Sequence, residues 1–329
     1  MKKHFIGIDI SKRTLDVCVY SPLINPENYT QVTNDSLGFK TLLKWFKSKS
    51  FSFSDIVICM EHTGIYGLDI SLFFEANSLD YCMISGYEMK HSVGFARGKS
   101  DKVDSFRIAH YCYLYREELK YSRVKSKVLL SLRDLMSERR SCVKRASQCK
   151  AYLTEHKKNT DSSGYSRYSR ELKYLNTFIH EIEKELILII ESDSDLYNTY
   201  KLITSIVGIA LINAVNVLLY TNNFEAFDNA REYACYCGIA PFSKQSGTSI
   251  NSPAKTDSMC NKTLKSELTQ ASLSAIVHDS ELRMYYQRKL MSGKHPGVIL
   301  NAVKFKLLER IFAVVKRGTP YVKLSTYSS

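Results

Sequence analysis

The stretch between Ser122 and Pro241 constrains the fold most, because it contains no proline and repeats apolar residues at alternating spacings of three and four. Such spacing places the repeated side chains on one face of a helix, so we predict two long helices that form a hairpin with coiled-coil character over residues 122–199. A break at Ser162-Ser163-Gly164 separates the two runs. The runs are Leu132, Leu135, Arg139, Cys142, Ala146, Cys149 and Leu153, then Leu172, Leu175, Ile179, Ile182, Leu186 and Ile189.

The role of this hairpin stays open at the level of sequence. Each run spans only about three heptads, which suits two amphipathic helices packed on their own domain as well as a zipper between subunits. The first run is also basic, and its cations are either a solvated face or a nucleic-acid contact. They are Arg133, Arg139, Arg140, Lys144, Arg145 and Lys150.

Residues 1–121 alternate between short apolar and amphipathic segments. Phe5–Asp9 and Leu15–Tyr20 are rich in β-branched and aromatic residues and predict a strand hairpin. A helix, a strand, a helix and a strand are predicted next, over residues 37–47, 55–60, 66–76 and 81–84. This order predicts an α/β domain with a mixed sheet.

Residues 200–329 predict a mainly α C-terminal domain, with helices over 263–278, 281–291 and 297–316. Gly318 and Pro320 are typical of the end of the last helix. The segment Thr204–Ala210 is similar to the turn of a helix-hairpin-helix. Its residues suit a plain turn between two buried helices equally well.

The charge balance favours a polyanionic partner. The 329 residues include 46 Lys and Arg against 33 Asp and Glu, a formal charge of +13. The sequence predicts no signal peptide and no membrane span. Nine cysteines without a CxxC pair predict reduced thiols and a cytoplasmic protein.

Four acidic residues stand where an α/β sheet commonly binds ligands. Asp9 ends the first apolar strand, and Glu61 directly follows the strand over 55–60. Asp101 and Asp104 are three apart at the start of a predicted helix, which puts them on one face. Converging carboxylates would repel unless divalent cations neutralised them, and Mg²⁺ or Mn²⁺ prefers such oxygen ligands. Taken singly, each acid also suits a helix cap, a turn or an exposed surface.

A second candidate site lies between Tyr236 and Ser249, where Pro241 and Gly247 bracket a predicted polar loop that carries Lys244 and Ser246. A serine is a poor nucleophile at neutral pH unless a base, a cation or a metal activates it. By its residues alone, this segment also suits an ordinary serine-rich turn.

The acidic motifs carry a family resemblance. GIDIS at the N-terminus, MEHTGIYG near residue 60 and KSDKVDSFRIA near residue 100 resemble, in order and spacing, the DEDD motifs of the Piv-type insertion-sequence transposases. The resemblance implies a RuvC-like domain of ribonuclease H fold that binds divalent metal through Asp9, Glu61, Asp101 and Asp104. Ser105 stands where the family more often has alanine.

The serine segment resembles the GxAPxxxxSG signature of the same family's C-terminal domain. This likeness implies that Ser246 is the nucleophile, while Ser243 and Ser249 stay open as substitutes. Further similarity runs through Lys262–Ile276, Glu281–Tyr286 and Lys316–Tyr321, nearly to the end of the chain. The usual glycine is missing from Pro253–Asp257, which leaves the role of Lys255 open.

The resemblance predicts a transposase or site-specific recombinase that cuts and rejoins DNA through a serine-linked intermediate. It implies donor and target DNA and a structured guide RNA that some members use. Because the carboxylates and the serine lie in different predicted domains and the heptad-spaced hairpin could join subunits, we also predict a homo-oligomer, either a dimer or a tetramer. We predict nucleic-acid contacts at Lys99, Lys102, Arg107, Lys244 and Lys255.

Three other functions fit parts of the sequence. A metal-dependent nuclease or junction resolvase would use the carboxylates alone. An actin-like kinase shares the GIDIS opening, but we find no later Asp-x-Gly phosphate loop. A non-catalytic DNA- or RNA-binding protein would not require Asp9.

Overall fold

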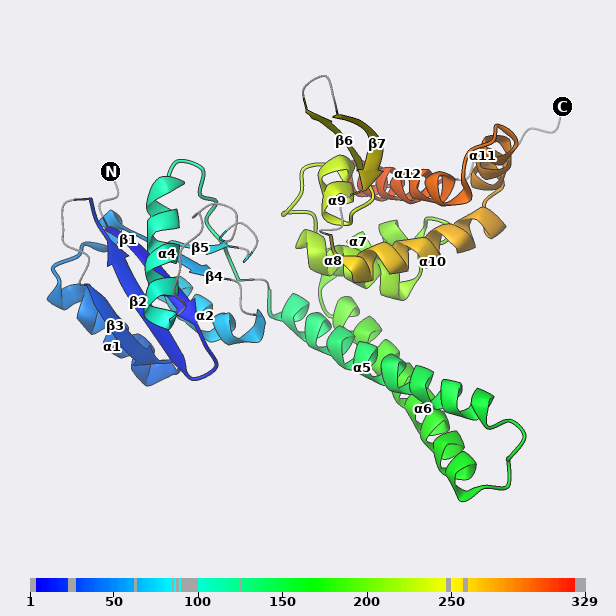
Figure 1. Cartoon of the computed structure of the whole chain (residues 1–329), viewed down its shortest axis with the longest axis horizontal. Coiled ribbons are helices and arrows are strands. Elements are labelled where there is room, and N and C mark those ends of the chain that lie inside the picture. Colours follow the sequence, from blue (N-terminus) through cyan, green and yellow to red (C-terminus); the bar gives the residue numbers. More distant parts are fainter. Residues whose placement is uncertain are drawn as a thin grey trace. The chain divides into compact units, whose positions relative to one another are not determined.

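The computed structural model describes residues 4–22, 28–61, 64–84, 86, 89, 100–124, 126–246, 250–256 and 260–322, with side chains except at 64–65, 242–246 and 250–255. The chain divides into two compact units, Met1–Val124 and Lys125–Ser329 (Figure 1). The first holds a mixed α/β sheet and the second is mostly helical. The predicted hairpin and the predicted C-terminal domain both fall in the second unit.

Five strands of the first unit form one sheet in the order β3-β2-β1-β4-β5. β1 (His4–Ile10) and β2 (Thr14–Tyr20) are antiparallel, as predicted, whereas β4 (Ile56–Glu61) runs parallel to β1 and β5 (Tyr81–Ile84) runs parallel to β4. The sequence analysis missed β3 (Tyr29–Thr33), which pairs antiparallel with β2 at the sheet edge. Only Val32 of β3 is buried, so its apolar signal is weak.

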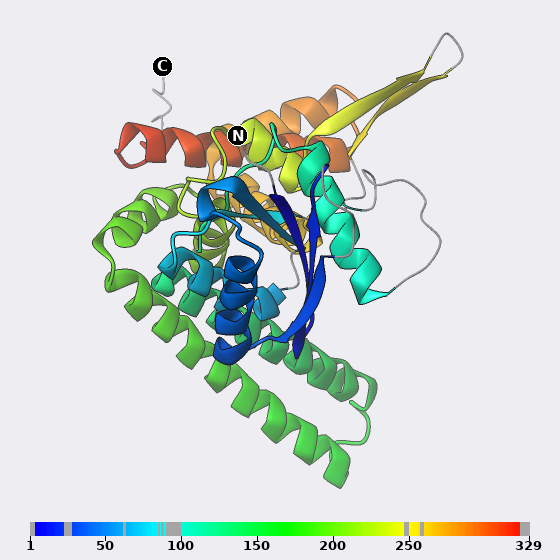
Figure 2. The same cartoon turned by 90° about the vertical axis from the view of Figure 1, so that its left-hand side faces the viewer.

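Helices cover both faces of this sheet. α1 (Ser36–Ser48) and α4 (Asp101–Leu114) lie on opposite sides of the strands, in blue and teal in Figure 2. α2 (Leu68–Ala76) shares the core of α1, and short 3-10 turns occupy Phe53–Asp55 (η1) and Gly64–Gly67 (η2). The α1 core contains Ile6, Ile8, Ile58 and Met60, and the α4 core contains Phe5, Val57, Cys59, Ile108 and Cys112. Alternate residues of β1 and β4 therefore face different helices.

Gly7 sets how closely α4 approaches β1. A Cβ at Gly7 would lie 2.2 Å from the backbone nitrogen of Ala109 and 2.2 Å from the carbonyl oxygen of Ser105. We expect Gly7→Ala to lower the free energy of unfolding by about 1–3 kcal/mol, because backbone atoms must move apart. Urea denaturation measures this. Gly67→Ala is the matched control, since a Cβ there would meet, among the described residues, only the side-chain ends of Ile10 and Met83. Equal losses in both variants would contradict the expectation.

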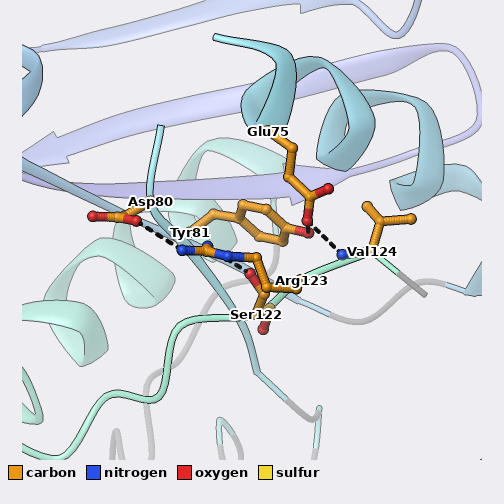
Figure 3. A network of polar contacts seen from close by, with 6 residues as sticks. All are labelled: Glu75, Asp80, Tyr81, Ser122, Arg123 and Val124. Atoms are coloured by element: carbon orange, nitrogen blue, oxygen red, sulfur yellow. Dashed lines mark hydrogen bonds and ion pairs between the residues drawn. The ribbon is translucent and has the colours of Figure 1, made fainter. Parts of the chain in front are cut away.

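Residues 122–124 close the first unit. The backbone N–H of Ser122 donates to the carbonyl of Tyr81 at 2.8 Å, and the N–H of Met83 donates to Ser122 Oγ at 2.8 Å. The N–H of Val124 donates to Glu75 Oε1 at 2.5 Å, and Arg123 pairs with Asp80 at 3.4 Å (Figure 3). The compact unit therefore extends past the predicted boundary at residue 121.

The second unit begins with a helical hairpin, α5 (Lys127–Glu155) and α6 (Ser163–Glu191). Its buried residues include Leu132, Cys142, Ala146 and Cys149 of the first run and Leu175, Ile182 and Leu186 of the second. Two cations of the basic run bind acids of α6, Arg139 to Glu183 at 2.7 Å and Arg145 to Glu171 at 2.9 Å. These ion pairs join the two helices.

One continuous hydrophobic core joins the hairpin to the helices that follow it. These helices are α7 (Ser194–Thr204), α8 (Leu211–Thr221), α9 (Ala230–Tyr236), α10 (Lys262–His278), α11 (Ser280–Met291) and α12 (Pro296–Arg317). The polar loop predicted between Pro241 and Gly247 was wrong, because β6 (Pro241–Ser246) forms an antiparallel hairpin with β7 (Ile250–Thr256). Among the described residues, no helix is both long and apolar enough to span a membrane.

Glu267 of α10 is a half-buried acid in this core. Asn216 of α8 donates a hydrogen bond to its carboxylate, and burial raises the pKa of Glu267 to about 7 against the opposing effect of Arg140 and Arg139. A raised pKa means that the folded state holds this proton more tightly than the unfolded state, so the contribution of Glu267 to stability falls as the pH rises from about 4.5 to about 7.

We expect Glu267→Gln to remove this part of the pH dependence, because the amide stays neutral and keeps an oxygen that accepts from Asn216. Urea unfolding at the acid and neutral ends of that window measures the difference. Glu185→Gln, at an exposed position of α6, is the control. Identical pH profiles for wild type and Glu267→Gln would contradict the expectation.

Candidate active site

The alternation of the strands brings Asp9 and Glu61 to one face of the sheet. Asp9 continues the series of Phe5 and Gly7 on β1, and Glu61 continues that of Val57 and Cys59 on β4. Both series face α4. Because Ile8 is the register partner of Met60, the two acids lie at nearly the same level near the ends of adjacent parallel strands.

α4 presents the other two acids at its start. Ser100 caps the helix, and its hydroxyl accepts a hydrogen bond from the backbone N–H of Val103 at 3.3 Å. Asp101 and Asp104 then occupy the first turn, where carboxylates also favour the helix dipole. Ser105 is fully buried and its hydroxyl donates to the carbonyl of Lys102 at 2.9 Å, so a small residue suits this position as alanine would.

The electrostatics of Asp9 show that the four acids lie near one another. Burial and, after it, repulsion from Asp101, Asp104 and Glu61 together raise the pKa of Asp9 to about 6. The structure therefore brings together all four acids that the sequence analysis selected. Their shared negative charge favours a cation at this point.

The described side chains do not close a ready-made metal cage. Among them, no group of three or more His, Cys, Asp or Glu residues is placed to hold a metal ion. Asp104 is turned toward Arg107, whose Nη1 lies 2.8 Å from its Oδ1. Glu61 Oε1 points at Gly86, where an added Cβ would lie 2.5 Å away.

A fifth acid, Asp16, belongs to this region and was missed. It lies directly opposite Asp9 in the β1–β2 pair, so both side chains share one face, and it also raises the pKa of Asp9. Asp16 is only 1% exposed, and its carboxylate accepts hydrogen bonds from Tyr29 at 2.5 Å and from Gln31 at 3.0 Å. Strand alternation around Leu15-Asp16-Val17 is the signal that could have identified it.

Two of the predicted nucleic-acid cations lie on α4 beside the carboxylates. Lys102 is exposed, with its ammonium 5.2 Å from the ring centroid of Tyr29. Arg107 is half-buried and pairs with Asp104. Lys99 lies outside the described residues. On this geometry, Arg107 holds a carboxylate while Lys102 stays accessible.

The serine segment is a strand hairpin in the second unit. Ser246 is the last residue of β6 and pairs with Ile250, while Lys244 pairs with Ser252 and Lys255 with Phe242. The register shifts between Phe242 and Lys244. Ser243 lies within this irregular stretch, and Ser249 falls outside the described residues. Ser246 therefore stands at the tip of the hairpin, where β6 ends.

The turn after α7 packs against α10. Gly208 adopts a φ of +93°, and a Cβ there would lie 2.7 Å from the carbonyl oxygen of Ala271 and 2.7 Å from the Cβ of Ala275. Glycine meets both demands, a left-handed backbone and a close helix contact. The backbone conformation and the close packing explain why Gly208 is a glycine, and no nucleic-acid contact is needed to explain it.

Known proteins resemble both parts of this architecture. A family model for the DEDD transposase of IS110 matches residues 6–159, and the model described as "Transposase IS116/IS110/IS902 family" matches residues 200–287. The pilin gene-inverting proteins of Moraxella bovis and Moraxella lacunata are each 25% identical over 331 residues, covering 98% of this chain and 99% of theirs.

An uncharacterised 43.6 kDa protein of insertion element IS110 in Streptomyces coelicolor is 27% identical over 146 residues, which cover 44% of this chain and 36% of that protein. The stretch matched by the first family model includes Asp9, Glu61, Asp101 and Asp104. The stretch matched by the second includes the β6–β7 hairpin with Ser246. The chain is thus similar to transposases of the IS110 family in both of its parts, and these similarities support a DNA recombinase or transposase enzyme.

Proposed function

We propose that this transposase cleaves and rejoins DNA through a covalent intermediate on Ser246, assisted by divalent metal on Asp9, Glu61, Asp101 and Asp104. The observation that carries the proposal is geometric: Asp9 and Glu61 lie at nearly the same level of two adjacent strands that face α4, and the first turn of α4 holds Asp101 and Asp104. The strand order and the helices on both faces support a RuvC-like, ribonuclease H-type fold for the first unit.

The four acids fit a divalent cation by their chemistry. They supply carboxylate oxygens, which Mg²⁺ and Mn²⁺ prefer, and a bound cation would relieve the repulsion around Asp9. When bound, such metal stabilises negative charge on the phosphoryl group in transfer. Asp104 would exchange its contact with Arg107 for this role.

The proposed cleavage is a transfer between two oxygens. Ser246 loses its proton as its Oγ forms a bond to the scissile phosphorus, and the bond from phosphorus to one sugar oxygen breaks. The released sugar oxygen takes up a proton. A sugar hydroxyl of the new partner strand then attacks the phosphoserine and restores the serine, so the phosphodiester is conserved.

The proposed partners are donor and target DNA, a structured guide RNA and further copies of the chain. The formal charge of +13 supports nucleic-acid binding, with Lys99, Lys102, Arg107, Lys244 and Lys255 as proposed contacts. The name of the Moraxella relatives, pilin gene-inverting proteins, supports inversion of a DNA segment as one outcome. The α5–α6 hairpin is the proposed element for assembly into a dimer or tetramer.

A plasmid assay tests the proposal. Full-length protein, Mg²⁺, RNA transcribed from the sequence flanking the element, and donor and target plasmids are expected to give recombinant junctions and a protein–DNA adduct. Cleavage without rejoining or adduct would favour the alternative, a metal-dependent nuclease or junction resolvase. Recombination that is unchanged without RNA would contradict the guide.

A further inference from the structure

Three cations surround one tyrosine on the surface formed by α11 and α12. The ring centroid of Tyr285 lies 4.9 Å from Lys306 Nζ, 5.9 Å from Arg288 Cζ and 5.9 Å from Lys289 Nζ. Arg288 and Lys289 follow Tyr285 by three and four residues, so all three share one face of α11. Lys306 comes from α12, which contacts α11. We name these four residues the Tyr285 cluster.

No acid in the described part of the chain forms an ion pair with this cluster. None of its three cations forms an ion pair there, whereas Asp279 and Glu281, the acids at the start of α11, both bind Arg310, at 2.8 and 2.7 Å. Three like charges around one ring repel one another, and an anion with several phosphates would relieve that repulsion.

The surrounding surface is open. α11 buries only Leu282, and Met284 and Met291 are 52% and 89% exposed. Cations in the last turn also stabilise a helix through its dipole, which accounts for Arg288 and Lys289. It does not account for Lys306, which lies in the middle of α12. Each cation–ring contact contributes about 0.5–1 kcal/mol at exposed sites and holds its cation toward the ring.

We propose that the Tyr285 cluster binds the phosphate backbone of a nucleic-acid strand during recombination. Three cations from two helices gather around one ring, where they can contact the phosphates of a strand, and the contact carries no sequence information by itself. The proposal rests on the recombinase activity of the chain, but it requires neither Ser246 nor metal. It adds a docking surface to the contacts proposed near the carboxylates and the serine.

Salt-dependent binding of the full-length protein tests this proposal. We would measure fluorescence anisotropy with a duplex DNA and a single-stranded RNA between about 50 and about 200 mM salt. The variant Arg288→Gln, Lys289→Gln, Lys306→Gln is compared with Lys40→Gln, Lys44→Gln, Lys47→Gln, which removes the same charge from exposed positions of α1. Each lost phosphate contact lowers the slope of log affinity against log salt by about 0.9 for duplex DNA and about 0.7 for a single strand.

We expect the Tyr285-cluster variant to lose up to about 2.7 of this slope on duplex DNA or about 2.1 on RNA, and the α1 variant to lose clearly less. The nucleic acid whose salt slope changes more, duplex DNA or single-stranded RNA, is the one that the cluster binds. Equal slopes for the two variants on both probes would overturn the proposal while leaving the strand-exchange assay unaffected. Tyr285→Phe, which keeps the ring, is expected to bind like wild type, and Tyr285→Leu to bind more weakly.

Discussion

Ser246→Ala is expected to abolish strand exchange and the covalent protein–DNA adduct together. The substitution removes the only atom proposed to bond to phosphorus, and losing a nucleophile costs on the order of 10⁶-fold in rate where enzymes of known mechanism have been dissected. Ser246 ends β6 at the tip of a two-stranded hairpin, so the change is expected to leave the helical core folded. Adduct formation is measured on denaturing gels with labelled DNA.

Neighbouring hydroxyls supply the controls for this prediction. Ser243→Ala and Ser249→Ala test the two substitutes that the sequence leaves open, and Ser252→Ala tests the opposite strand, where Ser252 pairs with Lys244. All three are expected to retain the adduct. If Ser243→Ala or Ser249→Ala loses it and Ser246→Ala does not, the nucleophile is reassigned. If cleavage persists in every serine variant, the covalent mechanism is wrong.

The sequence predicted the strands that are strongly buried and the helices that have a long apolar repeat. The strand at Tyr81–Ile84 and the helices α10, α11 and α12 were predicted to within one residue at each end. Their signals are local, a run of buried residues or a cap such as Gly318. The 3-4 repeats likewise predicted the α5–α6 hairpin, because each helix buries one apolar face, chiefly against the other.

The two missed strand regions depend on partners rather than on local pattern. β3 buries one residue and is defined by its pairing with β2. The β6–β7 hairpin contains Pro241 and Pro253, and proline normally argues against a strand because it cannot donate a ladder hydrogen bond. A two-stranded sheet has an open edge on each strand, so these prolines are tolerated.

The sequence led to four candidate metal-binding acids, but it did not reveal how other charged residues surround them. Strand ends and helix spacing selected Asp9, Glu61, Asp101 and Asp104; in the structure the first two lie on strand faces toward α4 and the last two lie in the first turn of α4. Asp16 was missed because its relevance comes from cross-strand register, which pairs it with Asp9, and from Tyr29 on the unpredicted strand β3. The contact of Arg107 with Asp104 also required the fold.

Asp9→Asn is expected to reduce strand exchange by more than 100-fold and to weaken Mn²⁺ binding at least tenfold. Substitutions that only orient metal ligands already cost about 10–100-fold, and Asp9 is proposed as a ligand itself. Isothermal titration of the full-length protein with Mn²⁺ gives the affinity without relying on activity. Asp69→Asn, at an exposed position of α2, removes the same charge from the same unit and is expected to behave like wild type.

The stability of the metal-free variant separates a functional role of Asp9 from a structural one. Because burial and neighbouring acids raise the pKa of Asp9 to about 6, its charged form opposes folding, and this opposition grows as the pH rises from about 3.8 through about 6. A neutral asparagine removes that repulsion, so metal-free Asp9→Asn is expected to unfold at higher urea than wild type at neutral pH. A site selected for metal would thus gain stability as it loses function. If Asp9→Asn instead destabilises the protein and leaves Mn²⁺ affinity unchanged, Asp9 is a structural residue and the metal assignment is wrong.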